Sequence, residues 1–456
     1  MNRPAPRQRS RRRPPRTAKP AGDLRTRAFR ILQEIEDGGF ADALLGETLQ
    51  AEPLEARDAA LLTRLVYGVT AWQARLDWTL APLSSRPFAE LDPPVRAALR
   101  LGLHQLLFLD RVPDHAAVST SVNLVKAEAG KGASGMANAI LRRVLREGER
   151  AMPEAGEDIA QHLAVRFSHP TWLVCRWLEE FGEERTRGLL AANQEAARTT
   201  LRSRNPAGRD TAIAALRDAG IRAEAGRFAP AAIDIDAPRG RLDDATSAGL
   251  VAQGEASQLV ACLLAAGPRG RLLDLCAAPG GKTEYLRDQL GSEATVLAAD
   301  PARAGVRRLK ARGLPLVVRA DGRQPPLRAG WFEGVLVDAP CSGLGTLRGH
   351  PEIRWRRTAD DIARLAATQR EILDAAARLV RPGGRLVYAT CTLLSEENDD
   401  VRDSFLATHP EFVGVDVRAS LPEAARGLVD SGGALRTSPD RDDLDGFFAC
   451  ILQRKK

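Results

Sequence analysis

The sequence has few cysteines and no long apolar run, and both shortages argue against whole classes of protein. Six cysteines occur among 456 residues, and no two of them form a Cys-x-x-Cys pair. A structural zinc site is therefore not expected, and we predict reduced thiols in a cytoplasmic protein. No run of about 18 apolar residues occurs, so no membrane-spanning helix is expected. The first residues lack an apolar core, which predicts no secretory signal.

The composition is that of a globular protein, with basic charge gathered at one end. Hydrophobic residues make up 44% of the chain and charged residues 27%, and the length predicts two or three domains. Residues 1–22 are predicted to form a disordered basic tail, because the first 19 carry eight basic side chains and no acidic one. Such a tail either holds phosphates by releasing counterions or only aids solubility. By itself it does not establish nucleic-acid binding.

Residues 23–150 are predicted to form an all-helical domain. Apolar residues recur there at helical spacing, and we interpret them as core positions. The stripes are Leu61, Leu62, Leu65 and Val66; Leu99, Leu103, Leu106 and Leu107; and Val118, Val122 and Val125. After a charged stretch, residues 160–245 predict a smaller module, helical at first and mixed α/β from Thr199 onward.

Residues 246–456 have the pattern of an α/β domain. Six short apolar runs alternate with helical stretches: RLLDLC, TVLAAD, LPLVVRAD, GVLVDAP, GRLVYATC and GFFACIL. Strands separated by helices predict βαβ units and a mostly parallel sheet. The last run, residues 446–452, is predicted as an added edge strand. The expected fold is therefore multidomain, an all-α N-terminal domain followed by a Rossmann-like α/β domain.

The loop after the first strand of this domain carries the strongest cofactor signal. Its sequence is DLCAAPGGKT, residues 274–283. Small residues let the backbone approach a ligand, and the following helix offers free N–H groups. The final GKT resembles the end of a phosphate loop, but that motif needs glycine where Cys276 stands, and no Gly-x-Gly-x-x-Gly is present. A phosphate-binding NTPase is therefore disfavoured, whereas a nucleoside ligand such as S-adenosylmethionine fits.

Acidic residues end the next three strands. Asp300 lies where a carboxylate can accept hydrogen bonds from ribose hydroxyls, and Asp321 is placed to reach an adenine amino group. Asp338 ends the fourth strand. A single aspartate in such a position is usually a cap or turn residue. Three of them at successive strand ends indicate a nucleoside-binding crevice.

Two cysteines follow adjacent strands at the same edge of the sheet. Cys341 follows Asp338-Ala339-Pro340, and Cys391 follows Ala389-Thr390. Carbon 5 of cytosine is a poor nucleophile, but addition of a thiolate to C6 makes C5 enamine-like and able to attack a sulfonium methyl group. Asp338 is placed to hold the N3–N4 edge of the base and to offset the charge that develops. The aromatic residue typical of amino-group methyltransferases is absent, and a thiol stands in its place.

Three segments resemble the Sun-type RNA cytosine-C5 methyltransferases, most closely their bacterial RsmB branch. They are DLCAAPGGKT (274–283), DAPCSGLGTLRGHPEIRW (338–355) and YATCTLLSEEN (388–398). The N-terminal helices resemble the NusB-type RNA-binding fold in LVYG (65–68), LRLG (99–102) and NAILR (138–142). The resemblance implies a NusB-like domain at 23–150 and an S-adenosylmethionine-dependent methyltransferase domain at 246–456.

The resemblance also implies an activity and a set of site residues. A methyl group would pass from S-adenosylmethionine to C5 of a specific cytosine in small-subunit (16S) ribosomal RNA, before the subunit is fully assembled. Cys391 would be the nucleophile and Cys341 would assist release of the adduct, with Lys282 and Asp338 facing the active site. The expected cofactor-binding residues are Cys276, Ala277, Ala278, Pro279, Gly280, Gly281, Lys282, Asp300, Asp321 and Asp338. No metal, membrane or obligate protein partner is implied.

Some positions depart from the family pattern or leave alternatives open. Thr392 follows the nucleophile where serine is usual, and Gly305 stands where arginine often follows the ribose-binding aspartate. Trp355 and the arginines beside it either contact RNA or begin a solvated helix. Another RNA, such as tRNA, is the alternative substrate. An RNA-binding assembly factor with a vestigial catalytic domain is the alternative class, and the intact thiols and acids argue against it.

Overall fold

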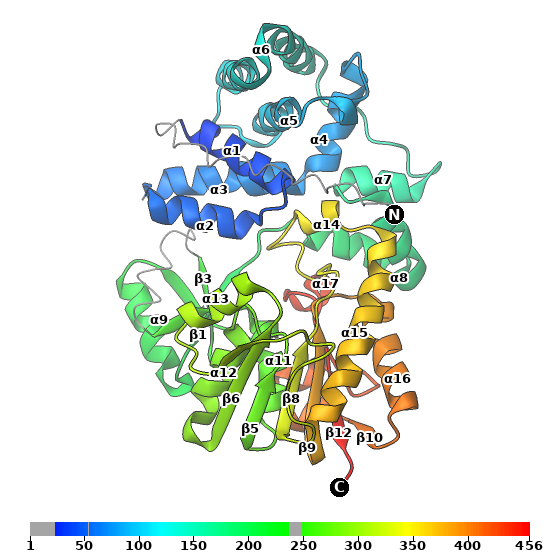
Figure 1. The fold of residues 1–456 in the computed structure, drawn as a ribbon. Helices are drawn as coiled ribbons and strands as arrows, with labels where there is room; N and C mark the ends of the chain where they lie inside the picture. The colour runs from blue at the N-terminus through cyan, green and yellow to red at the C-terminus, as the bar shows by residue number, and fades with distance from the viewer. Residues whose placement is uncertain (1–22, 53, 237–248) are drawn as a thin grey trace, which may run out of the picture.

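The computed structural model describes residues 23–52, 54–236 and 249–456. The predicted basic tail, residues 1–22, lies outside the described residues, as does the end of the predicted middle module. Figure 1 shows helices at one end of the molecule and a large sheet, which holds the C-terminus, at the other. The predicted fold class, all-α followed by α/β, is confirmed. No helix in the described part of the chain is long and apolar enough to span a bilayer.

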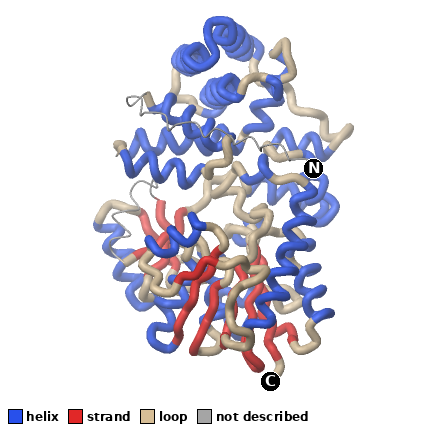
Figure 2. Tube along the Cα trace, viewed as in Figure 1, coloured by secondary structure: helices blue, strands red, loops and turns tan. Residues whose placement is uncertain are grey.

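The N-terminal part is helical, as its apolar stripes predict. Its helices are α1 (Leu24–Glu36), α2 (Ala41–Ala51), α3 (Ala56–Ala71), α4 (Gln73–Leu80), α5 (Pro93–Phe108) and α6 (Asp114–Glu147). Figure 2 shows that the strands of the described residues are confined to the other end of the molecule. Leu62, Leu65 and Val66 of α3 are fully buried in one core with Leu99 and Leu103 of α5.

Helices α3 and α5 approach closely at a glycine. A Cβ atom added at Gly68 would lie 2.1 Å from Nε2 of His104, and the His104 ring is itself buried. Burial lowers the pKa of His104 to about 3, so its imidazole is neutral at physiological pH. The small residue at this point therefore sets the spacing of the two helices.

The middle of the chain forms two helices and a small antiparallel sheet. The helices α7 (Ile159–Arg166) and α8 (Thr171–Ala192) precede the strands. The sheet has the order β2-β3-β1-β4, with all three pairings antiparallel. Its strands are β1 (Thr199–Ser203), β2 (Arg222–Ala225), β3 (Ala232–Asp236) and β4 (Leu250–Ala252), and α9 (Arg209–Asp218) packs on it. The predicted domain boundaries themselves stay a prediction.

The larger sheet carries the strands expected from the six apolar runs. Its order is β10-β12-β9-β8-β5-β6-β7, and β11 pairs with β12. The five strands from β9 to β7, which forms one edge of the sheet, run parallel. The strands are β5 (Gly270–Asp274), β6 (Ala294–Asp300), β7 (Val317–Arg319), β8 (Phe332–Asp338), β9 (Val380–Thr390), β10 (Phe412–Val415), β11 (Leu435–Arg436) and β12 (Phe448–Arg454).

Helices cover both faces of this sheet. Alternate residues of β8 point to opposite faces: Leu336 packs with α11 and α12, whereas Val335 and Val337 pack with α15. This alternation buries the sheet on both sides and leaves its carboxyl edge for chemistry. The α-helices of this part of the chain, of which the single-turn α14 and α17 lie in its loops, are α11 (Glu255–Ala265), α12 (Gly281–Leu290), α13 (Arg303–Ala311), α14 (Ile353–Arg356), α15 (Ala359–Leu379), α16 (Asp399–Thr408) and α17 (Pro439–Asp442).

The strand predicted at residues 446–452 is present as β12, but its predicted position at the edge of the sheet is wrong. Strand β12 lies between β9 and β10 and pairs antiparallel with both. The edge is instead β10, a short strand that the sequence pattern did not reveal. An apolar run predicts burial, and burial on two sides is what an interior strand has.

Prediction from the fold: Gly68→Ala lowers the thermal stability of the protein. The new methyl group meets the buried His104 ring, and overpacking of this kind costs about 1–3 kcal/mol. Gly46→Ala is the matched control, because Gly46 lies inside α2 with no atom near the added Cβ. It gains about 0.5–1 kcal/mol from helix propensity. Calorimetric melting of the two variants tests this, and equal shifts of the same sign would contradict it.

Candidate active site

The predicted cofactor loop lies between β5 and α12. The chain leaves the sheet at Asp274 and turns through residues 275–280, where the Ala278–Pro279 peptide bond is cis. Gly280 then begins α12 with a φ of 109°, a left-handed value that favours glycine. A Cβ at Gly280 would lie 3.0 Å from a methyl group of Leu309, so the loop also packs tightly against α13. The predicted cofactor loop therefore lies at the sheet edge, between a strand end and a helix start.

Asp274 is a buried carboxylate with one unused oxygen. Its Oδ2 accepts a hydrogen bond of 2.7 Å from Oγ1 of Thr283, whereas its buried Oδ1 has no hydrogen-bond partner. Burial raises the pKa of Asp274 to about 7. An orphaned acceptor beside a ligand-binding loop fits a donor on the ligand. Asp274 was not predicted as a site residue, although it begins the DLCAAPGGKT motif.

Asp300 and Asp321 occupy the ends of the next two strands. Asp300 accepts hydrogen bonds from the backbone N–H groups of Ala278, at 3.3 Å, and Ala302, at 2.8 Å. A Cβ at Gly305 would lie 2.2 Å from Oδ1 of Asp300, so the glycine that departs from the family pattern makes room for this carboxylate. Asp321 is exposed and paired with Arg323, whose hydrogen bonds lower the pKa of Asp321 to about 2.

Four carboxylates converge on the loop. Cys276, a half-buried residue of the loop, has its sulfur 3.7 Å from a Cβ built at Gly322. Burial, and then the charges of Asp274, Asp338, Asp300 and Asp321, raise the pKa of the Cys276 thiol. Such a field suits a cationic ligand, and S-adenosylmethionine carries a sulfonium and an ammonium group. The donor set of this edge therefore fits that cofactor.

The two predicted thiols meet at the carboxyl ends of β8 and β9. The sulfurs of Cys341 and Cys391 are 3.2 Å apart, and both residues are free thiols. The backbone N–H of Cys391 also donates to Sγ of Cys341 at 3.3 Å. The hydrogen bond with Cys391, together with burial, raises the pKa of Cys341 well above its usual value. Cys341 is therefore a neutral thiol in this arrangement.

Lys282 links the cofactor loop to the thiols. Its Nζ donates to Oδ2 of Asp338 at 2.6 Å and lies 5.2 Å from the centre of the Phe447 ring. Burial opposes the charged form of Lys282, but the attraction and hydrogen bond of Asp338, and then the Cys391 sulfur, raise its pKa above the ordinary value. The Lys282 ammonium group is thus paired with the Asp338 carboxylate and attracted by the Cys391 sulfur. Phe447 was not predicted.

A buried polar network, also missed at the sequence level, holds the two cysteine loops together. Glu397 accepts hydrogen bonds of 2.9 Å from the backbone N–H of Ser342 and from Nε2 of Gln369. The hydroxyl of Ser342 bonds to Oγ1 of Thr392 at 2.9 Å. The only signal for this network was the SEEN sequence inside the third motif. Thr392, the departure from serine, supplies its hydroxyl to the network.

Residues 354–357 neither begin a solvated helix nor face open solvent. Arg354 is fully buried and donates to the carbonyl of Ser168 at 3.0 Å. The indole Nε1 of Trp355 donates to the carbonyl of Thr70 in α3 at 2.7 Å. Both side chains hold parts of the protein together, which contradicts the alternative of a solvated helix start, whereas RNA contact by the partly exposed Trp355 stays a prediction.

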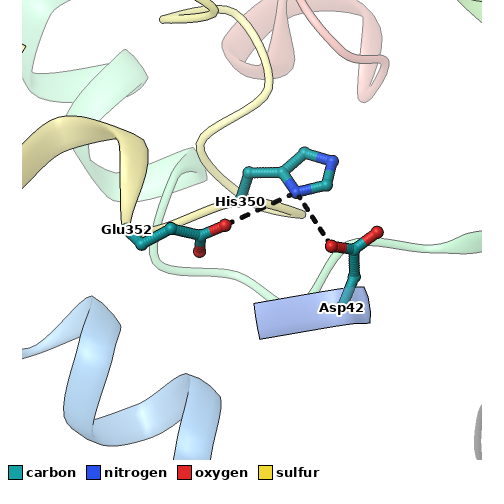
Figure 3. A group of neighbouring side chains, drawn as sticks. All are labelled: Asp42, His350 and Glu352. Carbon is teal, nitrogen blue, oxygen red and sulfur yellow. Dashed lines mark ion pairs between the residues drawn. The ribbon is translucent and has the colours of Figure 1, made fainter. Parts of the chain in front are cut away.

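One group in the described residues has the donors for a metal ion, although the sequence predicted none. Asp42, His350 and Glu352 place one ligand atom each within 4.8 Å of the others. Nδ1 of His350 lies 3.7 Å from each carboxylate (Figure 3). Burial lowers the pKa of His350, but the two carboxylates outweigh it and raise the pKa. Because this favours the imidazolium, we interpret the group as an ion-paired junction between α2 and the loop after Cys341.

Comparisons with known proteins agree with the order of parts in the structure. A family model described as 16S rRNA methyltransferase RsmB/F matches residues 261–453. The NusB family matches residues 23–146, and an RsmF/B-like ferredoxin-like domain matches residues 169–240.

Two curated relatives and one solved structure align over nearly the whole chain. The probable ribosomal RNA small subunit methyltransferase B of Bacillus subtilis is 33% identical, covering 95% of this chain and 99% of the relative. The ribosomal RNA small subunit methyltransferase B of Thermus thermophilus is 38% identical, covering 95% and 98%. The crystal structure of PH0851 matches with a TM-score of 0.82 at 25% identity, covering 96% and 100%. The chain therefore belongs to the RsmB/F family of S-adenosylmethionine-dependent 16S ribosomal RNA methyltransferases, with a NusB domain at its N-terminus.

Proposed function

We propose that this enzyme methylates C5 of a specific cytosine in 16S ribosomal RNA through a covalent adduct between Cys391 and C6 of the base. The observation that carries the proposal is the pair of sulfurs 3.2 Å apart at the ends of β8 and β9. Methylation of a ring carbon needs a nucleophile and a group that restores the ring. Two thiols at one edge supply both, whereas methylation of an amino group needs neither.

In the first step, the Cys391 thiolate adds to C6. A sulfur–carbon bond forms, the C5–C6 double bond opens, and negative charge spreads onto the ring. Asp338 holds the N3–N4 edge of the base with its second oxygen, since Oδ2 already binds Lys282. The Lys282 ammonium group, buried beside Cys391, offsets the developing charge in a region with little water.

In the second step, C5 forms its bond to the methyl group. S-adenosylmethionine, when bound, would supply that methyl group from its positively charged sulfur, with the sulfur–methyl bond breaking to leave the neutral thioether S-adenosylhomocysteine. Residues 276–282 and the carboxylates of Asp300, Asp321 and Asp338 are the groups of this chain that would hold it. Asp300 is fixed by the N–H groups of Ala278 and Ala302, so its position is set before the cofactor arrives.

In the last step, a base removes the C5 proton and the Cys391–C6 bond breaks, which restores the C5–C6 double bond. We assign this base to Cys341. The contact with Cys391 is the largest cause of its raised pKa. Once the sulfur of Cys391 is bonded to C6 of the cytosine, it no longer raises the pKa of Cys341 in this way. Cys341 then loses its proton to solvent more readily. The resulting thiolate accepts the C5 proton, and Cys391 leaves as a thiolate.

Prediction on the substrate: the enzyme methylates deproteinised 16S ribosomal RNA faster than the assembled small subunit or tRNA. The target base must leave its stack to bring C6 to Cys391, and free RNA allows this at lower cost. Nucleoside mass spectrometry of the product is expected to show 5-methylcytidine at one position. A methylated amino group, or equal transfer to tRNA, would contradict the proposal.

Prediction on the cofactor: Asp300→Ala weakens binding of S-adenosylmethionine about 10- to 150-fold, the loss expected when hydrogen bonds to a charged group worth roughly 1.5–3 kcal/mol are removed. Affinity for RNA is expected to stay unchanged. Calorimetric titration measures both. Asp210→Ala is the matched control, because that side chain is 82% exposed and pairs with the neighbouring Arg209. An unchanged cofactor affinity for Asp300→Ala would remove this residue from the site.

Prediction on the thiols: Cys391→Ala abolishes methylation and forms no covalent complex with RNA. Cys341→Ala still forms the complex and methylates the base, but release stalls. A protein–RNA species that survives a denaturing gel therefore accumulates in Cys341→Ala when cofactor is present, and the double variant forms none.

The same substitution at two neighbouring cysteines thus gives opposite results, which two merely structural thiols would not do. Cys450→Ala is the control, because Cys450 is a buried thiol inside β12, opposite Tyr388 of β9, and does not follow a strand end. A complex trapped by Cys391→Ala and not by Cys341→Ala would exchange the two roles. Wild-type turnover in both variants would end the covalent mechanism.

A further inference from the structure

The segment that follows the first thiol reaches from the active site to the NusB domain. We call residues 348–357 the strap. It contains the single-turn helix α14, which places consecutive side chains about 100° apart around one axis. Neighbouring residues of this turn can therefore contact different domains. Figure 1 shows α14 between the NusB helices and the sheet.

One side of the strap is bonded to the NusB domain. Trp355 donates to the carbonyl of Thr70 in α3 at 2.7 Å. Arg356 donates to the carbonyl of Ile35, at the end of α1, at 2.8 Å. His350 is ion-paired with Asp42 in α2 at 3.7 Å, as Figure 3 shows. The strap is thus anchored on three helices of the NusB domain.

The other side of the strap is bonded to the Cys341 loop. Arg357 donates through Nε to the carbonyl of Ser342 at 2.9 Å and through a terminal nitrogen to the carbonyl of Cys341 at 3.3 Å. One guanidinium group therefore fixes two successive peptide carbonyls of the loop that carries the thiol. Arg357 adjoins Arg356, so only one peptide bond separates the anchor on the NusB domain from the anchor on the active site.

We propose that Trp355 and Arg357 are positioning residues, through which the NusB domain holds the Cys341 thiol against Cys391. Neither residue touches the reacting atoms. The catalytic domain's own network fixes the N–H of Ser342 through Glu397 and the carbonyl of Pro340 through Gln369. The carbonyls of Cys341 and Ser342 are instead held by hydrogen bonds from Arg357. The NusB domain thereby takes part in setting the catalytic geometry, beyond any RNA that it binds.

Disulfide formation in the full-length protein, without RNA, tests this directly. Diamide takes two electrons and two protons from a pair of thiols, and the rate of bond formation reports how well the pair is held together. Peptide mapping follows the Cys341–Cys391 disulfide. Trp355→Phe keeps the ring and removes the N–H donor to Thr70, and Arg357→Lys keeps the charge and removes the two-carbonyl clamp. Matched controls are Trp331→Phe and Arg364→Lys, whose side chains are exposed and lie outside the strap.

We expect Arg357→Lys and Trp355→Phe to slow this disulfide at least about fivefold, because a loosened loop lowers the effective concentration of one thiol at the other. The controls are expected to react as the wild type does. Wild-type rates in both strap variants would overturn the proposal. Because no RNA or cofactor is involved, this outcome does not depend on the reaction mechanism.

A second readout connects the strap to catalysis and rests on the proposed function. With RNA and cofactor, the strap variants are expected to accumulate the covalent complex that Cys341→Ala accumulates, since misplacing a reacting group by about 1 Å can cost on the order of 100-fold in rate. If the strap variants form the disulfide slowly but Cys341→Ala traps no complex, the proposed role of Cys341 in release is refuted. The proposal that the strap positions Cys341 still holds in that case. A trapped complex in Cys341→Ala with wild-type release in both strap variants would overturn the strap's part in the reaction.

Discussion

The juxtaposition of two thiols at one edge of a parallel sheet is the constraint on which the rest of the structure depends. The two free thiols keep their sulfurs 3.2 Å apart because both loops that carry them are held in place. Strands β8 and β9 fix where the loops begin, because they are neighbours in parallel register. Beyond these strands, the loops are held by contacts within the catalytic domain and by contacts made through the strap.

From inside the catalytic domain, Glu397 is the centre of this restraint. Burial raises its pKa, and hydrogen bonds from Ser342 oppose that rise, so its ability to accept depends on the network around it. The hydroxyl of Tyr388 completes the network by donating to the backbone carbonyl of Glu397 at 2.6 Å. Buried groups of this kind stabilise one geometry when all are satisfied and cost free energy when one is removed.

From outside, the restraint comes through the strap. Arg354 illustrates how closely the parts are joined, since its fully buried guanidinium donates to carbonyls of Ser168, Asn193 and Leu347, which belong to different segments. An arginine buried against carbonyls is costly to remove, because those acceptors lose their donors. Under the proposal above, the bonds of Trp355 and Arg356 to the NusB domain make that domain part of the catalytic framework.

The sequence predicted those features whose signal is local. A strand that ends in a small-residue loop, or in Ala-Thr-Cys, is recognisable from a few adjacent residues, so the five parallel strands and both thiols were found. It did not predict contacts between distant segments. Trp355 and its arginines have the same local pattern whether they face RNA or a neighbouring domain, and β12 is an apolar run wherever it pairs. The pairing of Asp321 with Arg323 likewise depends on how a loop turns back on itself.

The most direct test of the central claim is to identify the atom that bonds to RNA. A 16S ribosomal RNA containing 5-fluorocytidine at the target position would be methylated but could not lose fluorine as a cation, so the adduct would persist. Digestion and tandem mass spectrometry then locate the modified peptide. We expect the nucleotide to be attached to Cys391, in the peptide that includes Tyr388 and Thr392. Attachment to Cys341, or methylated RNA with no attached peptide, would contradict it.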